Sequence, residues 1–203
     1  MTYYMLHKPR GCVSARVDRE NPTVMDFFPP EARTTLFPLG RLDKYTEGIL
    51  LVTDDGKLNR RLLDPDCRVE KQYFLWAVGE PTEEVCRALR EGVSCKGLAE
   101  KTRPARFEVL GKGVLRDIGP IVFPIRRPMV EESPEAPTFC AHLWLTEGKR
   151  HQVKRMLEAV GCTVVYLRRV AFGPLRLDEN LSPGAYRPLT EEEIAALRHL
   201  ANL

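Results

Sequence analysis

Apolar and polar positions along the chain follow two alternating periods. Short runs rich in β-branched, leucine and aromatic residues predict strands within residues 2–7, 48–53, 69–79, 105–110, 138–148 and 163–173. Amphipathic or capped stretches predict helices within residues 21–30, 54–65, 82–93, 149–161 and 188–200. Because the two element types interleave without a strict βαβ rhythm, we expect an α+β fold: a mixed, largely antiparallel central sheet with flanking helices.

Local signals fix several ends of these elements. Residues 8–11, Lys-Pro-Arg-Gly, predict a tight turn followed by a second short strand. Asp54 or Asp55 is placed to cap the helix that follows them, and Thr190 with Glu193 predicts a capping box at the start of the last helix. In the segment 149–161 apolar residues recur at i, i+3, i+4 and i+7, and a glycine ends the pattern, which predicts an amphipathic helix. The residues are Val153, Met156, Leu157, Val160 and Gly161.

The chain of 203 residues reads as one domain, residues 1–203, arranged as two lobes around a central cleft. The segment 124–137 holds four prolines with mixed charge, and we expect it to be an exposed loop between the lobes. Neither a signal peptide nor an apolar run of ~20 residues is present, so a cytoplasmic protein without a membrane partner is expected. The six cysteines lack C-x-x-C or zinc-site spacing and are expected to be free thiols.

Charge is more informative in its distribution than in its sum. The 31 basic and 28 acidic residues leave a formal net charge of only +3. Basic pairs recur at 126–127, 149–150, 154–155 and 168–169, whereas acids gather at 131–135 and 191–193. This segregation fits one positive face that contacts phosphate, although charge alone favours the plainer interpretation of solvated helix faces.

The stretch "GRLDKYTEGILLVTDDG" at 40–56 carries the first candidate chemistry. If residues 41–43 are extended, Arg41 and Asp43 project to the same side, and a guanidinium within ~4–6 Å would keep the carboxylate ionised for work as a nucleophile or base. A plain surface ion pair is the alternative. On the helix 149–161, Arg150 and Lys154 flank the apolar stripe, and Tyr73 lies inside an apolar strand where it could be core or a stacking ring for a base.

These residues lie within an ordered set of sequence blocks that together resemble one enzyme family. The blocks are "HKPRG", "GRLDKYTEGILLVTDDG", "EKQY", "EGKRHQVKRMLEAVG" and "VVYLRRVAFGPLRLDENLSPGAYRPLTEEE". In this order they are similar to the pseudouridine synthases, in the form typical of the ribosomal small-subunit and related large-subunit enzymes. The resemblance runs from about residue 3 to 194, and the ordered set makes it specific.

The resemblance implies a role for each matching residue. Asp43 becomes the catalytic aspartate, with Arg41 as its motif partner and Lys154 as the cation paired with it. Tyr73 becomes the ring that packs on the target base, and Leu167 the apolar wall of the pocket. The implied reaction breaks the uridine N1–C1′ bond, turns the uracil and rejoins it through C5, with no cofactor and no metal. Asp43 either attacks the sugar or abstracts a ribose proton, and the sequence leaves both open.

The expected partner is ribosomal RNA, free or within an assembling subunit, and the expected state is a monomer. From their clustering we expect phosphate contacts at Lys8, Arg150, Arg155 and Arg168. Many members of this branch carry an N-terminal S4 module, which we do not expect here because the catalytic strand begins at once. The target is expected in 16S RNA, and the alternatives are a large-subunit (23S) synthase and a catalytically silent RNA-binding protein.

A third alternative is a metal-dependent nuclease or phosphatase built on Asp43, Asp54 and Asp55. The apolar run between the first and the other two spans roughly 20 Å as a strand, at ~3.3 Å per residue, which is too far for one shared ion.

Overall fold

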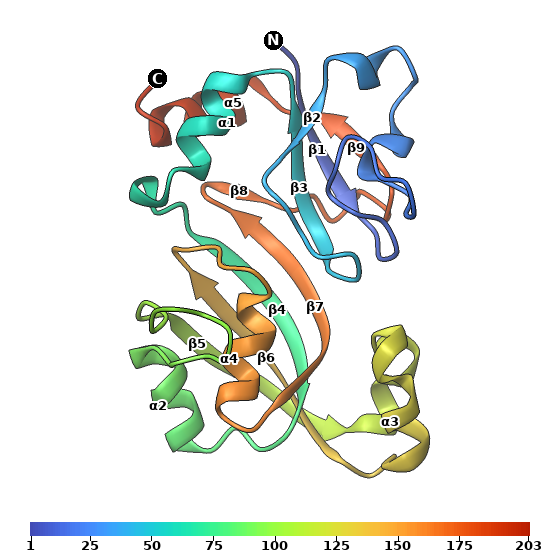
Figure 1. Cartoon of the computed structure of the whole chain (residues 1–203), viewed down its shortest axis with the longest axis vertical. Coiled ribbons are helices and arrows are strands. Elements are labelled where there is room, and N and C mark those ends of the chain that lie inside the picture. The colour runs from blue at the N-terminus through green and yellow to red at the C-terminus, as the bar shows by residue number, and fades with distance from the viewer. The chain divides into compact units, whose positions relative to one another are not determined.

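The computed structural model describes residues 1–203, and it confirms the expected α+β fold with a largely antiparallel sheet. The chain forms two compact units (Figure 1). We call residues 1–71 together with 169–203 unit 1, and residues 72–168 unit 2. No helix in the chain has both the length and the apolar character needed to cross a membrane.

Unit 1 is built around strands β1 and β3, which pair antiparallel along their length. The strand order is β9-β1-β3-β7, with β2 paired to β3 and β8 paired to the end of β7. Its elements are β1 (Tyr3–Lys8), the 3₁₀ turns η1 (Val24–Phe27), η2 (Ala32–Thr34) and η3 (Pro65–Cys67), β2 (Phe37–Leu39), β3 (Glu47–Thr53), α1 (Gly56–Leu63), β8 (Leu175–Arg176), β9 (Tyr186–Pro188), α5 (Glu191–Leu200) and the end of β7 (Thr163–Phe172).

Alternation along β1 and β3 builds the core of unit 1. Met5 and Ile49 are fully buried and pack in one cluster with Leu58 of α1 and Leu197 of α5. The two helices therefore cover the same face of the β1–β3 pair (Figure 1). Side chains at neighbouring positions in the strands, such as Leu50, are also fully buried, so β3 is apolar on both faces.

Gly48 allows β3 to run close to β7. Its φ is +114°, and a Cβ built there would lie 2.0 Å from the carbonyl oxygen of Arg169. Both the backbone angle and the space exclude any other residue. The glycine in "TEGILL" thus lets β3 pass close to β7 directly after the segment that carries Asp43.

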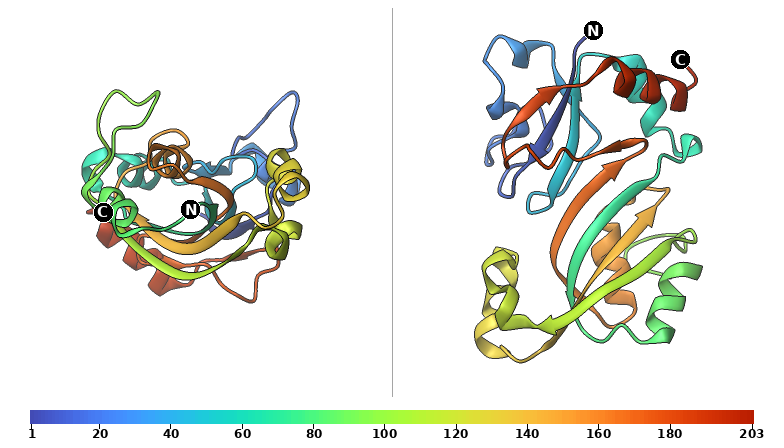
Figure 2. Two further views of the ribbon diagram at one scale, coloured as in Figure 1. Left: turned by 90° about the horizontal axis from the view of Figure 1, so that it is seen from below. Right: turned by 180° about the vertical axis from the view of Figure 1, so that it is seen from behind.

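Unit 2 has the strand order β5-β6-β4-β7. Its elements are β4 (Lys71–Val78), α2 (Glu83–Glu91), β5 (Arg106–Val114), η4 (Leu115–Ile121), η5 (Pro124–Arg126), α3 (Arg127–Glu132), β6 (Pro137–Leu145), α4 (Gln152–Ala159) and most of β7. Along β6 the odd-numbered side chains Phe139, Ala141 and Leu143 are fully buried. Helices α2 and α4 lie on the same face of this sheet (Figure 2).

The even-numbered side chains of unit 2 form an aromatic row on the other face. The Phe74 ring lies 5.9 Å from His142 and 6.2 Å from Tyr166, and His142 lies 5.4 Å from Trp144. Arg106 stacks over Trp144 at 3.7 Å. Because side chains alternate across a strand, these contacts assign Tyr73 of β4 and Leu167 of β7 to the opposite face, the one on the helix side.

Three sequence-based predictions about elements were wrong. The segment 124–137 is not an irregular loop: it forms η5 and α3, because Pro124 and Pro128 occupy first-turn positions where no N–H is needed. Strand β5 continues past residue 110 to Val114, with a bulge between Val109 and Gly111. The second short strand near residues 12–15 is only an isolated bridge from Val13 to Thr23.

The predicted caps and free thiols are confirmed. Asp55 accepts from the backbone N–H groups of Lys57 and Leu58 at the start of α1. Thr190 and Glu193 form a capping box on α5. Helix α4 ends before Gly161, whose φ is +81°. All six cysteines are free.

Candidate active site

Asp43 lies in unit 1, in a short non-repetitive segment between Gly40 and β3. Its side chain is half-buried. The carbonyl oxygen of Asp43 accepts from the N–H of Thr46 at 3.0 Å, which closes a turn over residues 43–46. The carboxylate is therefore carried by a tight turn that leads directly into a buried strand.

The buried side chain of Lys8 anchors this turn through hydrogen bonds to its backbone. Its side chain is 0% exposed, and its Nζ donates to the carbonyl oxygens of Asp43 at 3.1 Å, Lys44 at 3.2 Å and Thr46 at 2.8 Å, and of Pro9 at 3.0 Å. Burial lowers the pKa of Lys8 from 10.5 to about 8, and the nearby Cys12 and Asp43 act in the opposite direction. The group is still mainly an ammonium at neutral pH.

The predicted phosphate contact at Lys8 is therefore wrong. A fully buried amine cannot reach an RNA backbone, and its hydrogen bonds are already made within unit 1. The sequence pattern could not reveal this, because three of the four acceptors lie 35 to 38 residues further along the chain.

Two further contacts hold the same segment. Ser14 and Leu42 bond reciprocally at 3.0 Å, since the Ser14 hydroxyl donates to the Leu42 carbonyl and accepts from its N–H. The Lys44 ammonium donates to Asn21 Oδ1 at 2.8 Å. Lys8, Ser14 and Asn21 thus anchor the segment 42–46, and the sequence analysis assigns no function to Ser14 or Asn21.

The expected pairing of Arg41 with Asp43 is not seen. Arg41 is exposed, and no ion pair joins the two side chains. The prediction assumed strand alternation over residues 41–43, but Gly40 has a φ of +78° and the following residues pair with no strand. Any role for Arg41 as the motif partner of Asp43 stays a prediction.

Tyr73, Leu167 and Lys154 belong to unit 2. Tyr73 and Leu167 lie on the helix-side face of neighbouring strands; Tyr73 is half-buried, and Leu167 is buried. Lys154 lies on α4, which covers that face, and its ammonium is 4.9 Å from the centroid of the Phe123 ring. The three predicted pocket residues of unit 2 are thus presented on one side of its sheet.

The remaining basic residues predicted to contact phosphate differ in exposure and in their hydrogen bonds. Arg150 is exposed, but it precedes α4, whose N-cap is His151, so it is not a helical neighbour of Lys154 as expected. Arg155 is half-buried and donates to the Gly97 carbonyl at 3.1 Å. Arg168 is half-buried, with its Nε enclosed and unpaired.

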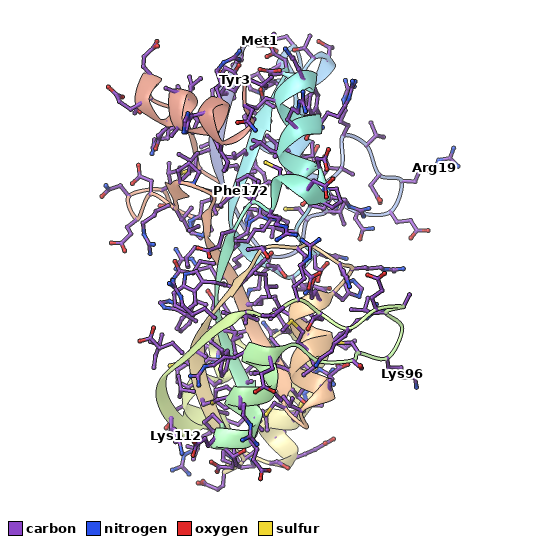
Figure 3. The ribbon with its side chains drawn as sticks, turned by 90° about the vertical axis from the view of Figure 1, so that its left-hand side faces the viewer. Met1, Tyr3, Arg19, Lys96, Lys112 and Phe172 are labelled. Atoms are coloured by element: carbon purple, nitrogen blue, oxygen red, sulfur yellow. The ribbon has the colours of Figure 1, made fainter.

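Arg155 and Glu147 anchor the loop 94–103, which the sequence had not singled out. Glu147 accepts from the Arg103 N–H at 2.8 Å and from the Gln152 amide at 2.7 Å, which joins the loop to the start of α4. Lys96 extends from this loop into solvent (Figure 3). The loop therefore adds an exposed cation to the side of unit 2 that bears α4.

The aspartates that follow β3 have structural partners. Asp54 accepts from the N–H of Thr2 at 2.7 Å. Besides its cap, Asp55 accepts from the Tyr3 hydroxyl at 2.7 Å and lies 3.4 Å from Arg198. Burial alone would raise the pKa of Asp55, but the hydrogen bonds from Leu58 N–H and Tyr3 lower it overall. Nowhere in residues 1–203 do three or more His, Cys, Asp or Glu side chains gather in a way that could hold a metal ion.

The sequence matches a known family over most of its length. The model of the family described as "RNA pseudouridylate synthase" matches residues 2–159. An uncharacterised RNA pseudouridine synthase of Bacillus subtilis is 42% identical over 201 residues, which cover 98% of this chain and 73% of the relative. The ribosomal small subunit pseudouridine synthase A of Haemophilus influenzae is 36% identical over 195 residues, or 96% of this chain and 73% of the relative.

Solved structures agree with the sequence match. A crystal structure of a pseudouridylate synthase superposes with a TM-score of 0.80 at 35% identity, covering 97% of this chain and 73% of that one. The archaeal box H/ACA Nop10–Cbf5 complex shares the fold at a TM-score of 0.54 and 19% identity. On the family match and the whole-length identity, the chain belongs to the RNA pseudouridylate synthase family.

Proposed function

We propose that this RNA pseudouridine synthase acts on a uridine of small-subunit ribosomal RNA. The observation that carries the proposal is the name shared by relatives from Haemophilus influenzae, Salmonella, Pseudomonas and Escherichia, ribosomal small subunit pseudouridine synthase A, at 35–37% identity over 96% of this chain. We further propose that residues 1–203 work as a single catalytic domain, as a monomer, in the cytoplasm.

Asp43 is proposed as the catalytic group. In the reaction the N1–C1′ bond of uridine breaks, a C5–C1′ bond forms, the hydrogen at C5 leaves as a proton, and N1 gains one. An aspartate takes part either by attacking C1′ or by removing a ribose proton, and both need a carboxylate in a fixed position. The turn that Lys8 anchors supplies such a position, because the backbone of residues 43, 44 and 46 is tied to one ammonium.

Lys154, Tyr73 and Leu167 are proposed to complete the pocket. The family pattern makes Lys154 the cation that pairs with Asp43, Tyr73 the ring that stacks on uracil, and Leu167 the apolar wall. Support comes from their common side of the unit 2 sheet. A uridine that leaves its stack costs a few kcal/mol, which stacking on an aromatic ring and contacts to phosphate offset.

Phosphate contacts are proposed at Arg150, Arg155 and Arg168, with Lys96 added by its exposure. A basic contact surface releases counterions on binding, so the logarithm of RNA affinity should fall linearly with the logarithm of salt concentration. A flat profile would contradict a phosphate-contacting surface. Charge-removing variants of true contact residues should each reduce the slope by about one.

The target is tested with transcripts of 16S and 23S RNA that carry tritium at uridine C5. Release of tritium from the 16S transcript, followed by mapping of a single pseudouridine in it, is the expected result. Release from the 23S transcript alone would replace the small-subunit assignment with a large-subunit one. RNA binding without any release, on free RNA and on partly assembled subunits, would favour a catalytically silent RNA-binding protein.

A further inference from the structure

Phe123 lies where the segment 115–136 meets α4, and its burial and two backbone hydrogen bonds fix its position. The side chain is 2% exposed. Its backbone N–H donates to the Val165 carbonyl of β7 at 2.8 Å, and its own carbonyl accepts from the Arg126 N–H at 2.8 Å. The adjacent Val122 is buried in one cluster with Val165. The ring therefore has little freedom to move relative to the strand.

The Lys154 ammonium lies over this immobile ring. Its Nζ is 4.9 Å from the ring centroid, within the ~6 Å over which a cation is attracted to an aromatic face. Lys154 is half-buried on α4, and the buried Phe123 ring lies next to its ammonium. A partly desolvated ammonium gains more from the ring quadrupole than an exposed one does.

We propose that Phe123 is a positioning residue for catalysis. Through a cation–π contact, its ring holds the Lys154 ammonium in the position that it needs during the reaction. The inference rests on the role of Lys154 in the proposed function. A lysine side chain has several rotatable bonds and loses rotamer entropy when it is fixed. A ring that restrains the ammonium before RNA binds removes part of that cost from the chemical step.

The alternative is that Phe123 only fills the core. Phe123→Leu would not separate the two, because it alters packing as well as the ring. Fluorination separates them, since mono-, di- and trifluorinated phenylalanine keep nearly the same shape but progressively weaken the negative potential of the ring face. Phe139 is a matched control: it is 0% exposed in the same unit, and its closest ring partner is Phe107 at 6.4 Å.

The experiment introduces the fluorinated series at residue 123 and, separately, at residue 139, and measures kcat and KM for tritium release together with the melting temperature. We expect kcat to fall stepwise at residue 123, by about fivefold for the trifluorinated ring, with KM and melting temperature nearly constant. The series at residue 139 should be flat. A flat series at residue 123 would overturn the positioning role.

Lys154→Met separates this inference from the function on which it rests. If the variant loses turnover and the series at residue 123 is flat, the inference fails and the proposed function stands. If Lys154→Met keeps the kcat of the parent enzyme, the proposed role of Lys154 fails, and the catalytic role of Phe123 fails with it. Loss of turnover together with a stepwise fluorine effect supports both.

Discussion

Replacing Lys8 by methionine tests whether a buried cation organises the Asp43 turn. The ammonium reaches four carbonyl oxygens at 2.8–3.2 Å. Two of these keep another donor when Lys8 is removed: the Asp43 carbonyl accepts from Thr46 N–H at 3.0 Å, and the Lys44 carbonyl accepts from Gly11 N–H at 2.8 Å. The carbonyl of Thr46 loses its donor, and that of Pro9 keeps only a weak thiol contact at 3.6 Å.

The expected change in stability is the difference of two larger effects. Each buried carbonyl left without a donor costs about 1–3 kcal/mol. In the other direction, methionine has no charge to bury, so the variant avoids the free-energy cost of taking the ammonium out of water. The pKa of Lys8, lowered from 10.5 to about 8, corresponds to a cost of ~3 kcal/mol. We therefore expect Lys8→Met to lower the free energy of unfolding by only ~1–2 kcal/mol.

The expected change in turnover is larger than the change in stability. Without the ammonium, the backbone of residues 43, 44 and 46 loses its common anchor, and a displaced catalytic group can cost ~10²-fold in rate. The assay compares kcat for tritium release with urea unfolding for Lys8→Met and for Lys57→Met, an exposed control on α1. A folded Lys8→Met enzyme within about twofold of the parent kcat would refute the reasoning.

Three more predictions follow from unit 1. The folded-state pKa of Lys8 lies below its unfolded value, so the unfolded chain holds more protons between about pH 8 and 10.5. The free energy of unfolding of the parent enzyme should therefore rise by ~2–3 kcal/mol relative to that of Lys8→Met from about pH 7.5 to 10. A difference between the two proteins that stays constant with pH in urea unfolding would contradict this. Asp55→Asn should lower the free energy of unfolding by ~1–2 kcal/mol and Asp54→Asn by less than ~1 kcal/mol, because only Asp55 has a buried charge that several donors share. Both variants should retain turnover. Equal unfolding midpoints for the two variants would contradict this difference. Arg187 binds both carboxylate oxygens of Glu193 at 2.9 Å, so Arg187→Lys should cost ~1–2 kcal/mol in thermal unfolding, and an unchanged melting temperature would show that the fork geometry is unimportant.

Local patterns predicted most of the secondary structure, because the forces that set it act over a few residues. The capping box of Thr190 and Glu193, the cap at Asp55 and the apolar stripe of α4 were all visible in the sequence. Prolines misled the prediction at 124–137, where proline content suggested an irregular loop. Pro124 and Pro128 instead lie in the first turns of η5 and α3, which only the three-dimensional structure shows.

The site was less accessible to such reasoning. The ordered family blocks singled out Asp43, but they could not show that Lys8 is buried, because its acceptors come from a distant part of the chain. The contact of Lys154 with the Phe123 ring likewise joins residues 31 positions apart. The strand expected over residues 41–43 was wrong, because Gly40 has a φ of +78° and the residues after it pair with no strand. Tertiary contacts, rather than periodicity, decide these positions.

The central claim is that Asp43 is the catalytic group, and Asp43→Asn tests it most directly. The amide keeps the shape of the side chain but can act neither as nucleophile nor as base. On one 16S transcript, tritium release and the pseudouridine map should be abolished, whereas RNA affinity and melting temperature stay close to those of the parent enzyme and Asp54→Asn remains active. A folded Asp43→Asn protein that still releases tritium from uridine C5 and forms pseudouridine would contradict the account.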